Sequence, residues 1–252
     1  MRVFLFIGIL CVAVRAQEDF AEPVANPVLQ RFSDRVTFLA SFDHGQAAAE
    51  MAAGNARPRA AIGEPEFVPG LFGLALAGGQ ISFHPQRNFP FEATGSLLLW
   101  VCPVDWEERA KEGYQWWFQS GGKGSSLLIG RQGEIKGTRR ATVYYHAVTD
   151  GHKPGGEHVT GGGWRAWANG TWHLVVVTWK LGRIAISVDG GTLRGRQVGK
   201  LTPQNWFNIG RKQTPGRRFL LDDVMIFDRV LKDDEIAWVW KRTAAVRAPE
   251  AE

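Results

Sequence analysis

Short runs of β-branched, aliphatic and aromatic residues recur along most of the chain, separated by clusters of Gly, Asn, Asp and Pro. Runs of this length with turn residues between them are typical of antiparallel strands rather than of strands alternating with helices. The pattern predicts ten strands, at 36–42, 80–84, 96–102, 115–120, 125–130, 141–147, 171–180, 184–188, 206–210 and 219–228. We therefore expect an all-β fold.

The segment 171–180 is apolar at both its odd and its even positions. A strand that is apolar on both faces is usually covered on both sides, so we expect this one at the centre of a sheet. The short turn at Leu181 and Gly182 predicts a hairpin to the strand at 184–188, with glycine supplying a positive φ.

Helix signals are few. In residues 232–238, an Asp suited to capping and further acidic side chains at 233–235 fit the first turn of a helix, which predicts a short C-terminal helix. The Ala-rich segment 46–61 has helical propensity but no apolar period, so we expect a long excursion with at most a helical turn.

The first sixteen residues are typical of a signal peptide. Arg2 precedes an apolar run at 3–14, and Ala16 is a small residue where cleavage can occur. Because the run is too short to span hydrocarbon, we expect no membrane span and a protein secreted to the periplasm or the extracellular space. The expected organisation is a signal peptide at 1–16, a lead-in or linker at 17–34, one domain at 35–243 and a flexible tail at 244–252.

The remaining composition narrows the function classes. The formal net charge is +5, and loss of Arg2 and Arg15 with the signal peptide would leave +3 (5 minus 2), which gives no reason to expect a nucleic-acid partner. Cleavage would also leave Cys102 as the one cysteine. We therefore expect no internal disulfide, so stability must come from core burial or a bound metal.

Seven segments occur in an order that resembles a known family. They include TWHLVVVTW at 171–179 and LDDVMIF at 221–227, and together they are 36–43, 69–76, 95–103, 170–179, 184–190, 207–210 and 221–231. In this order they resemble the laminin G-like, concanavalin A-like lectin and glucanase superfamily, in the version found in exported bacterial proteins. The resemblance covers nearly the whole mature chain. It implies a jelly-roll sandwich of two antiparallel sheets, with ligands on the concave face or its rim loops.

The same resemblance implies a structural calcium ion that joins the last strand to the first. The matching side chain is Asp222, with Asp43 and backbone carbonyls near Gly78 and Gly79 as companions, and Asp223 as a spare. Oxygen ligands suit such a hard cation. A carboxylate among apolar neighbours is costly to bury alone, so the alternative for Asp222 is a salt bridge or a hydrogen-bonded turn.

Carbohydrate recognition would require exposed flat aromatics with polar groups around them. The adjacent Trp116 and Trp117 must face opposite sides of their strand, so one of them belongs to the core. The candidate ligand-binding residues are this pair and, in the Gly-rich segment 151–170, Trp164, Trp167, His152, His158 and Arg165. The segment is expected to be a loop, and the alternative role for its tryptophans is packing onto the sheet.

Paired catalytic carboxylates are not apparent in the sequence. Glucanases of this fold carry Glu, Asp and Glu at alternate positions of one strand, and no segment here matches that spacing. The sequence therefore favours a non-catalytic, monomeric domain that binds a glycan or a cell-surface protein. The alternatives are a polysaccharide-cleaving glycosidase or lyase of the same fold, whose carboxylates would converge from separate strands, and a structural adhesion module.

Overall fold

The computed structural model describes residues 26–106, 115–122, 124–135, 138–147, 155–163, 167–213 and 215–247, and from 132 to 163 it describes the backbone alone. The described strands are β1 (Val36–Ala40), β2 (Met51–Ala52), β3 (Ala60–Pro69), β4 (Leu74–Phe83), β5 (Thr94–Pro103), β6 (Gln115–Gly122), β7 (Ser125–Ile135), β8 (Thr138–Ala147), β9 (Gly155–Gly163), β10 (His173–Lys180), β11 (Arg183–Val188), β12 (Arg194–Gln197), β13 (Trp206–Gly210) and β14 (Phe219–Phe227). The helices are α1 (Pro27–Phe32), the 3-10 turn η1 (Ser33–Arg35), α2 (Asp233–Arg242) and α3 (Ala244–Arg247).

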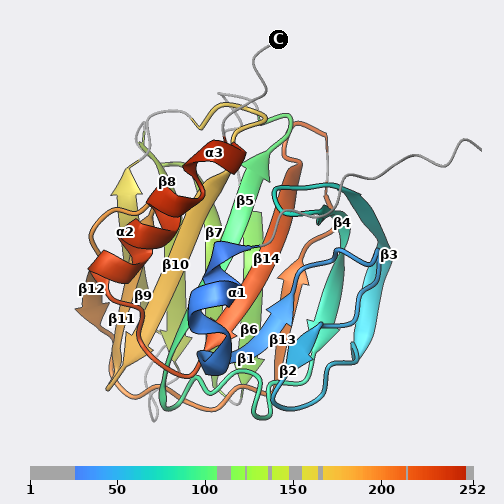
Figure 1. Ribbon diagram of the computed structural model, residues 1–252. Helices are drawn as coiled ribbons and strands as arrows, with labels where there is room; N and C mark the ends of the chain where they lie inside the picture. The colour runs from blue at the N-terminus through green and yellow to red at the C-terminus, as the bar shows by residue number, and fades with distance from the viewer. Residues whose placement is uncertain are drawn as a thin grey trace, which may run out of the picture.

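The strands form two packed antiparallel layers, as predicted (Figure 1). The first sheet has the order β12-β11-β10-β5-β14, with β1 also paired to β14. The second sheet has the order β4-β13-β6-β7-β8-β9, with β3 along the other edge of β4. Strand β4 connects the layers, because Leu76 pairs with β14 while the segment 80–83 pairs with β13. The architecture is a jelly-roll sandwich.

The core between the two sheets is built largely from aromatic rings. Phe38 from the first sheet meets Phe83 and Phe207 from the second edge-on, with ring centroids 4.9 and 5.1 Å apart. Trp117 and Trp179 are also fully buried in this cluster. Edge-to-face contacts of this kind add to the free energy gained by burying aromatic surface.

A second apolar cluster lies on the outer face of the first sheet. Helices α1 and α2 cover this face (Figure 1), and Phe32 and Ile236 from them pack against Leu98, Trp100 and Met225 of the strands. The first sheet is therefore buried on both sides, which confirms the central position predicted for β10.

Of two local predictions, one is confirmed in part and one is wrong. The Ala-rich segment 46–61 is a long excursion, as expected, but in place of a helical turn it contains β2 and the start of β3, which pair with β1 and β4. The Gly-rich segment 151–170 contains β9, which pairs with β8 from Ala147 to Arg140. Ladder hydrogen bonds to a neighbour outweigh weak intrinsic preferences in both segments.

The helices near the two ends of the described chain can be compared with the domain boundaries predicted from the sequence. The C-terminal helix is confirmed as α2, whose Glu235 side chain accepts from the backbone N–H of Lys232. Residues 27–35 form α1 and η1 against the first sheet, and α3 lies within the expected tail. The predicted signal peptide lies outside the described residues. No described helix is long and apolar enough to cross a membrane.

Candidate functional site

A row of directly opposed residues crosses the second sheet on its outer face. Ser82 on β4 lies opposite Asn208 on β13, which lies opposite Gln119 on β6, and Gln119 lies opposite Leu128 on β7. The residues next to them in sequence, such as Phe83 and Phe207, belong to the core. Because side chains alternate along a strand, this transverse row faces away from the core.

The polar members of the transverse row have unused hydrogen-bonding capacity. The side chains of Ser82, Gln119 and Asn208 make no hydrogen bond within the described part of the chain. Asn208 is only 9% exposed, yet its amide atoms are not among the fully buried polar atoms that lack a partner, so they retain contact with water. Polar groups in such a position gain free energy when a ligand supplies the missing partners.

Two tryptophans flank the row on the same face. Trp116 is half-buried at the start of β6, whereas Trp117 has 0% exposure and lies in the core, as the adjacency of the pair requires. Trp206, also half-buried, lies over Gly121, where a Cβ atom would be 2.5 Å from the indole ring. The absence of a side chain at Gly121 therefore lets this ring lie flat against the sheet.

Of the remaining candidates, Trp167 packs at one end of the sandwich. Its ring stacks on His173 with centroids 3.9 Å apart, and it lies 5.8 Å from Trp117 and 5.9 Å from Trp106. His173 is fixed in turn, because its Nδ1 lies 2.9 Å from Asp189 Oδ2. This arrangement matches the packed alternative for Trp167, and its contribution to a ligand site stays a prediction.

The other residues of the Gly-rich segment are placed only in part. The register puts His158 on β9 opposite Tyr144 on β8, and Tyr144 lies opposite Leu128, so His158 stands at the end of the transverse row. His152, Trp164 and Arg165 lie outside the described residues. The structure thus brings Trp116 and His158 to the same sheet, although they are far apart in the sequence.

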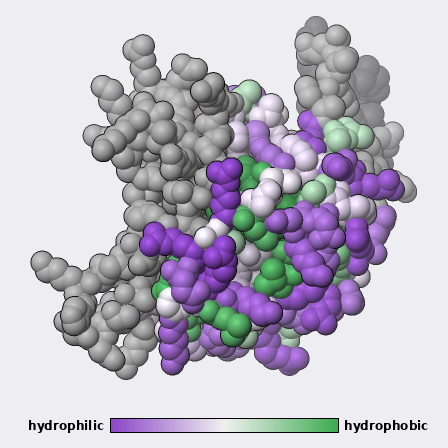
Figure 2. All heavy atoms as spheres, turned by 90° about the vertical axis from the view of Figure 1, so that its left-hand side faces the viewer, coloured by the Kyte–Doolittle hydropathy of each residue, from purple (hydrophilic) through white to green (hydrophobic). Residues whose placement is uncertain are grey.

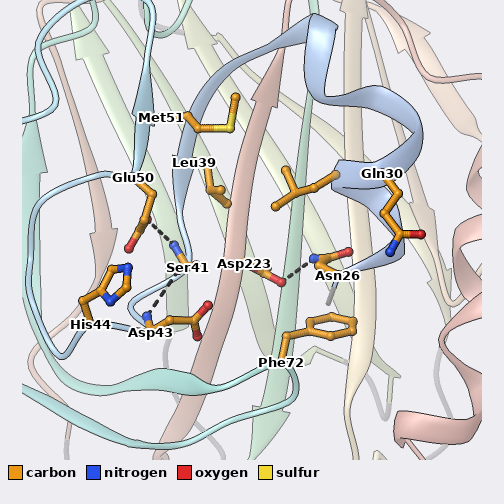
Figure 3. A pocket seen from close by; sticks show the side chains of 11 residues that line it. Asn26, Gln30, Leu39, Ser41, Asp43, His44, Glu50, Met51, Phe72 and Asp223 are labelled. Atoms are coloured by element: carbon orange, nitrogen blue, oxygen red, sulfur yellow. Dashed lines mark hydrogen bonds between the residues drawn. The ribbon is translucent and has the colours of Figure 1, made fainter. Parts of the chain in front are cut away.

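A separate acidic pocket of about 510 Å³ lies between α1, the segment after β1, and β14 (Figure 3). Glu50 Oε2 accepts from the backbone N–H of Ser41 at 2.8 Å, and Asp223 accepts from the Asn26 side chain. None of the described residues that line this pocket is a lysine or an arginine. The lining residues are Asn26, Leu29, Gln30, Leu39, Ser41, Asp43, His44, Glu50, Met51, Phe72 and Asp223.

Asp222, the neighbour of Asp223 on β14, is fully buried, and only one of its two carboxylate oxygens has a partner among the described residues. Its Oδ2 accepts from the backbone N–H groups of Leu71 at 2.6 Å and Phe72 at 3.1 Å, while Oδ1 is buried without a partner in the described part of the chain. The pKa of Asp222 is raised to about 7, mainly by burial and also by the charge of Asp43, while the two hydrogen bonds act in the opposite direction. Burial and the charge of Asp222 likewise raise the pKa of Asp223 well above its ordinary value.

The carboxylate oxygens of Asp43 and Asp222 are of the kind that binds a hard cation, although they do not form a complete metal site among the described residues. Asp43 Oδ1 accepts from Leu74 N at 3.0 Å, so Asp43 and Asp222 both hold the segment that connects β3 to β4. The orphaned Oδ1 of Asp222 is an oxygen that a calcium ion could satisfy. Among the described residues, however, no three His, Cys, Asp or Glu side chains are close enough together to bind a metal ion.

The sequence analysis missed part of the acidic pocket. It named Asp223 only as a spare, yet Asp223 lines the pocket while Asp222 is committed to backbone N–H groups. The Asp-Asp pair was the available signal, but the bulge that gives Asp223 a φ of 45° could not be read from it. Glu50 gave no signal, because the excursion after β1 alone brings it here.

Comparisons with solved structures show similar folds at low sequence identity. A botulinum neurotoxin DC binding domain, solved in complex with SialylT, matches with a TM-score of 0.60 and 14% identity over 84% of this chain and 51% of its own. The botulinum neurotoxin serotype D binding domain gives 0.61 and 13% over 83% and 52%. The chain spans about half the length of these domains.

Domain 4 of AbnA, an extracellular GH43 arabinanase from Geobacillus stearothermophilus, was solved in complex with arabinotriose. It matches with a TM-score of 0.56 and 15% identity over 81% of this chain and 98% of its own. No curated protein matches. A family model, described as the concanavalin A-like lectin/glucanases superfamily, matches residues 77–237. The chain therefore belongs to the concanavalin A-like lectin/glucanases superfamily.

Proposed function

We propose that this chain is an exported, non-catalytic domain that binds glycans through the outer face of its second sheet. The observation that carries the proposal is the transverse row, whose Ser82, Gln119 and Asn208 side chains have no partners in the described part of the chain. Trp116 and Trp206 flank that row.

The chemistry of this face suits a sugar. Apolar C–H faces of a pyranose or furanose ring can stack on the two indole rings, while the hydroxyl groups pair with the amides and the serine. Asn208 can both donate and accept through one side chain, which suits vicinal hydroxyls. The arabinanase domain of the same fold, solved with arabinotriose, supports a saccharide as the ligand class.

A glycan array with variants of this face tests the proposal. We expect Trp116→Ala and Asn208→Ala each to weaken binding of the best glycan about tenfold, since each removes roughly 1–1.5 kcal/mol of contact. Trp238→Ala is the matched control, because Trp238 is a half-buried tryptophan on the helix-covered side.

Equal weakening by the control would overturn this location of the site. Binding to no glycan, together with binding to a cell-surface protein, would favour the adhesion alternative. Release of shortened oligosaccharides from an incubated polysaccharide would instead favour the glycosidase or lyase alternative.

We further propose a structural calcium ion held by Asp222 and Asp43. Its support is the buried, unpartnered Oδ1 of Asp222 and the excess of carboxylates around it. A cation there would offset the desolvation of these groups and tie β14 to the segment after β1. Thermal melting with and without a chelator tests this: we expect a lower Tm with chelator in the wild type and no change in Asp222→Asn. An unchanged Tm in the wild type removes the calcium proposal.

A further inference from the structure

The hairpin between β10 and β11 places two cations side by side. Lys180 and Arg183 are directly opposite each other, and the two residues between them, Leu181 and Gly182, have φ values of 49° and 74°. Two positive φ values in a two-residue loop define a tight hairpin turn whose strands cannot slip in register. The two basic side chains are therefore fixed next to each other.

This pair is unfavourable for the fold itself. Lys180 and Arg183 are both exposed, and neither has an ion-pair partner among the residues that the structure describes. Like charges directly opposite in an antiparallel ladder destabilise it. The pair thus concentrates positive charge at a place where it does not stabilise the sheet. Such an arrangement is expected where a bound anionic ligand compensates the two positive charges.

A small hollow lies beside the pair, on the outer face of the first sheet beyond α2. Its volume is about 230 Å³, and it is lined by Thr178, Lys180, Arg183, Ala185, Leu193 and Val230. Thr178 is only 4% exposed, and its hydroxyl makes no hydrogen bond within the described ranges. The two acids nearest in sequence to Val230 are committed elsewhere. Asp228 pairs with Arg35 at 2.9 Å, and Asp233 Oδ1 accepts from Leu193 N at 2.8 Å.

We propose that this hollow binds an oxyanion group, a carboxylate or a sulfate, carried by an acidic saccharide. Lys180 and Arg183 would neutralise the oxyanion with charge-assisted hydrogen bonds, and the Thr178 hydroxyl would donate a third. Leu193 and Val230 supply apolar walls for the sugar ring. About 230 Å³ is below the usual range for drug-sized ligands, so the hollow fits one sugar unit.

The neighbouring surface gives such a ligand room to continue. Leu181 at the turn is 82% exposed, and its carbonyl is fixed by Gln197 Nε2 at 2.9 Å. A second hollow of about 650 Å³ is lined by Leu181, together with Lys200 and one acid, Glu92, among others. On the side of the molecule that carries β11 and β12, hydrophobic residues form small patches among hydrophilic ones (Figure 2). Two hollows next to the same turn suit successive units of a polymer better than a flat membrane surface.

This site is independent of the proposed glycan face, which belongs to the other sheet. The test is a titration of the full chain with sodium glucuronate, glucose and sodium sulfate at constant ionic strength, followed by amide NMR. We expect glucuronate to shift the amides of 178–183, sulfate to shift them at higher concentration, and glucose to leave them unchanged. Trp116→Ala should not alter this titration, so the two sites can fail separately.

Variants make the test specific. We expect Lys180→Gln and Arg183→Gln each to weaken glucuronate about tenfold, and Thr178→Val to weaken it several-fold. Lys241→Gln, which removes one exposed cation from α2, is the matched control and should have no effect. Equal weakening by the control, or the absence of shifts at 178–183, would overturn the site. Sulfate binding as tight as glucuronate would overturn the saccharide part, and stronger binding to phosphatidylserine vesicles than to glucuronate would assign the hairpin to a membrane.

Discussion

The two sheets present opposite kinds of outer face. The outward residues of the first sheet, such as Leu98 and Trp100, are apolar and are covered by α1 and α2. The described outward residues of the second sheet include Ser82, Gln119 and Asn208, which are polar. Both sheets use the same alternation, and both contribute to one aromatic core. The difference teaches that one outer face is used to hold the fold together, while the other is left available for a ligand.

The sharpest way to break this comparison is to remove one tryptophan from each outer face. We expect Trp100→Ala to lower the free energy of unfolding by about 3–5 kcal/mol, because Trp100 is fully buried beneath Trp240 and the helices. Trp116→Ala should cost less than about 1.5 kcal/mol, since Trp116 is half-buried whereas Trp100 is fully buried. Urea denaturation measures both changes. Equal losses would show that the second outer face is also structural.

The acidic residues at the edge of the covered face give a pH test. Asp222 has its pKa raised from 3.8 to about 7, so the folded state binds more protons than the unfolded state between these values. In chelator, stability should therefore fall as pH rises from about 4 to about 7, by on the order of 2–4 kcal/mol, and the raised pKa of Asp223 adds to this fall.

Asp222→Asn is the matching variant, because its side-chain oxygen can still accept from Leu71 and Phe72. We expect a smaller fall in stability between pH 4 and 7 in this variant, with the contribution of Asp223 remaining. An unchanged slope in denaturation midpoints would assign the pH dependence to other groups. Binding at the polar face should not follow this transition.

The covered face shows what a single sequence can reveal. The apolar residues on both faces of β10 predicted a twice-covered strand, because alternation is a local property of the chain. The hairpin after β10 could be predicted in the same way, since a glycine such as Gly182 between two β-rich runs indicates a turn. Local patterns of this kind identified the strands and the family.

The candidate sites depend on contacts that no local pattern contains. Asn26 caps α1 through Val28 N and also donates to Asp223, 197 residues away. The transverse row is assembled from β4, β13, β6 and β7 by register alone. In the sequence its members are ordinary polar residues in separate strands, and only the pairing brings them to one face.

The turn between β10 and β11 lies at an end of the first sheet, and a substitution there tests the comparison of the two sheets further. Leu181→Asn should raise the free energy of unfolding by about 0.5–1 kcal/mol, because asparagine adopts a positive φ more readily than leucine and Leu181 is 82% exposed. Thermal melting at fixed pH measures the gain. A loss of stability would mean that the Leu181 side chain contributes packing to the fold.

The smallest effect concerns the charge pair itself. Arg183→Glu converts the Lys180 and Arg183 pair into opposite charges, which should stabilise the hairpin by roughly 0.2–1 kcal/mol at low salt. The wild type should gain stability as salt screens its repulsion, whereas the variant should lose part of its gain. Lys180→Glu should behave in the same way, since either substitution gives one charge of each sign.

If both variants become more stable and both lose glucuronate binding, the wild-type chain keeps the Lys180 and Arg183 pair for binding at the expense of stability. A loss of stability in both variants would instead mean that the two cations have structural partners, and the end of the first sheet would then resemble its covered part.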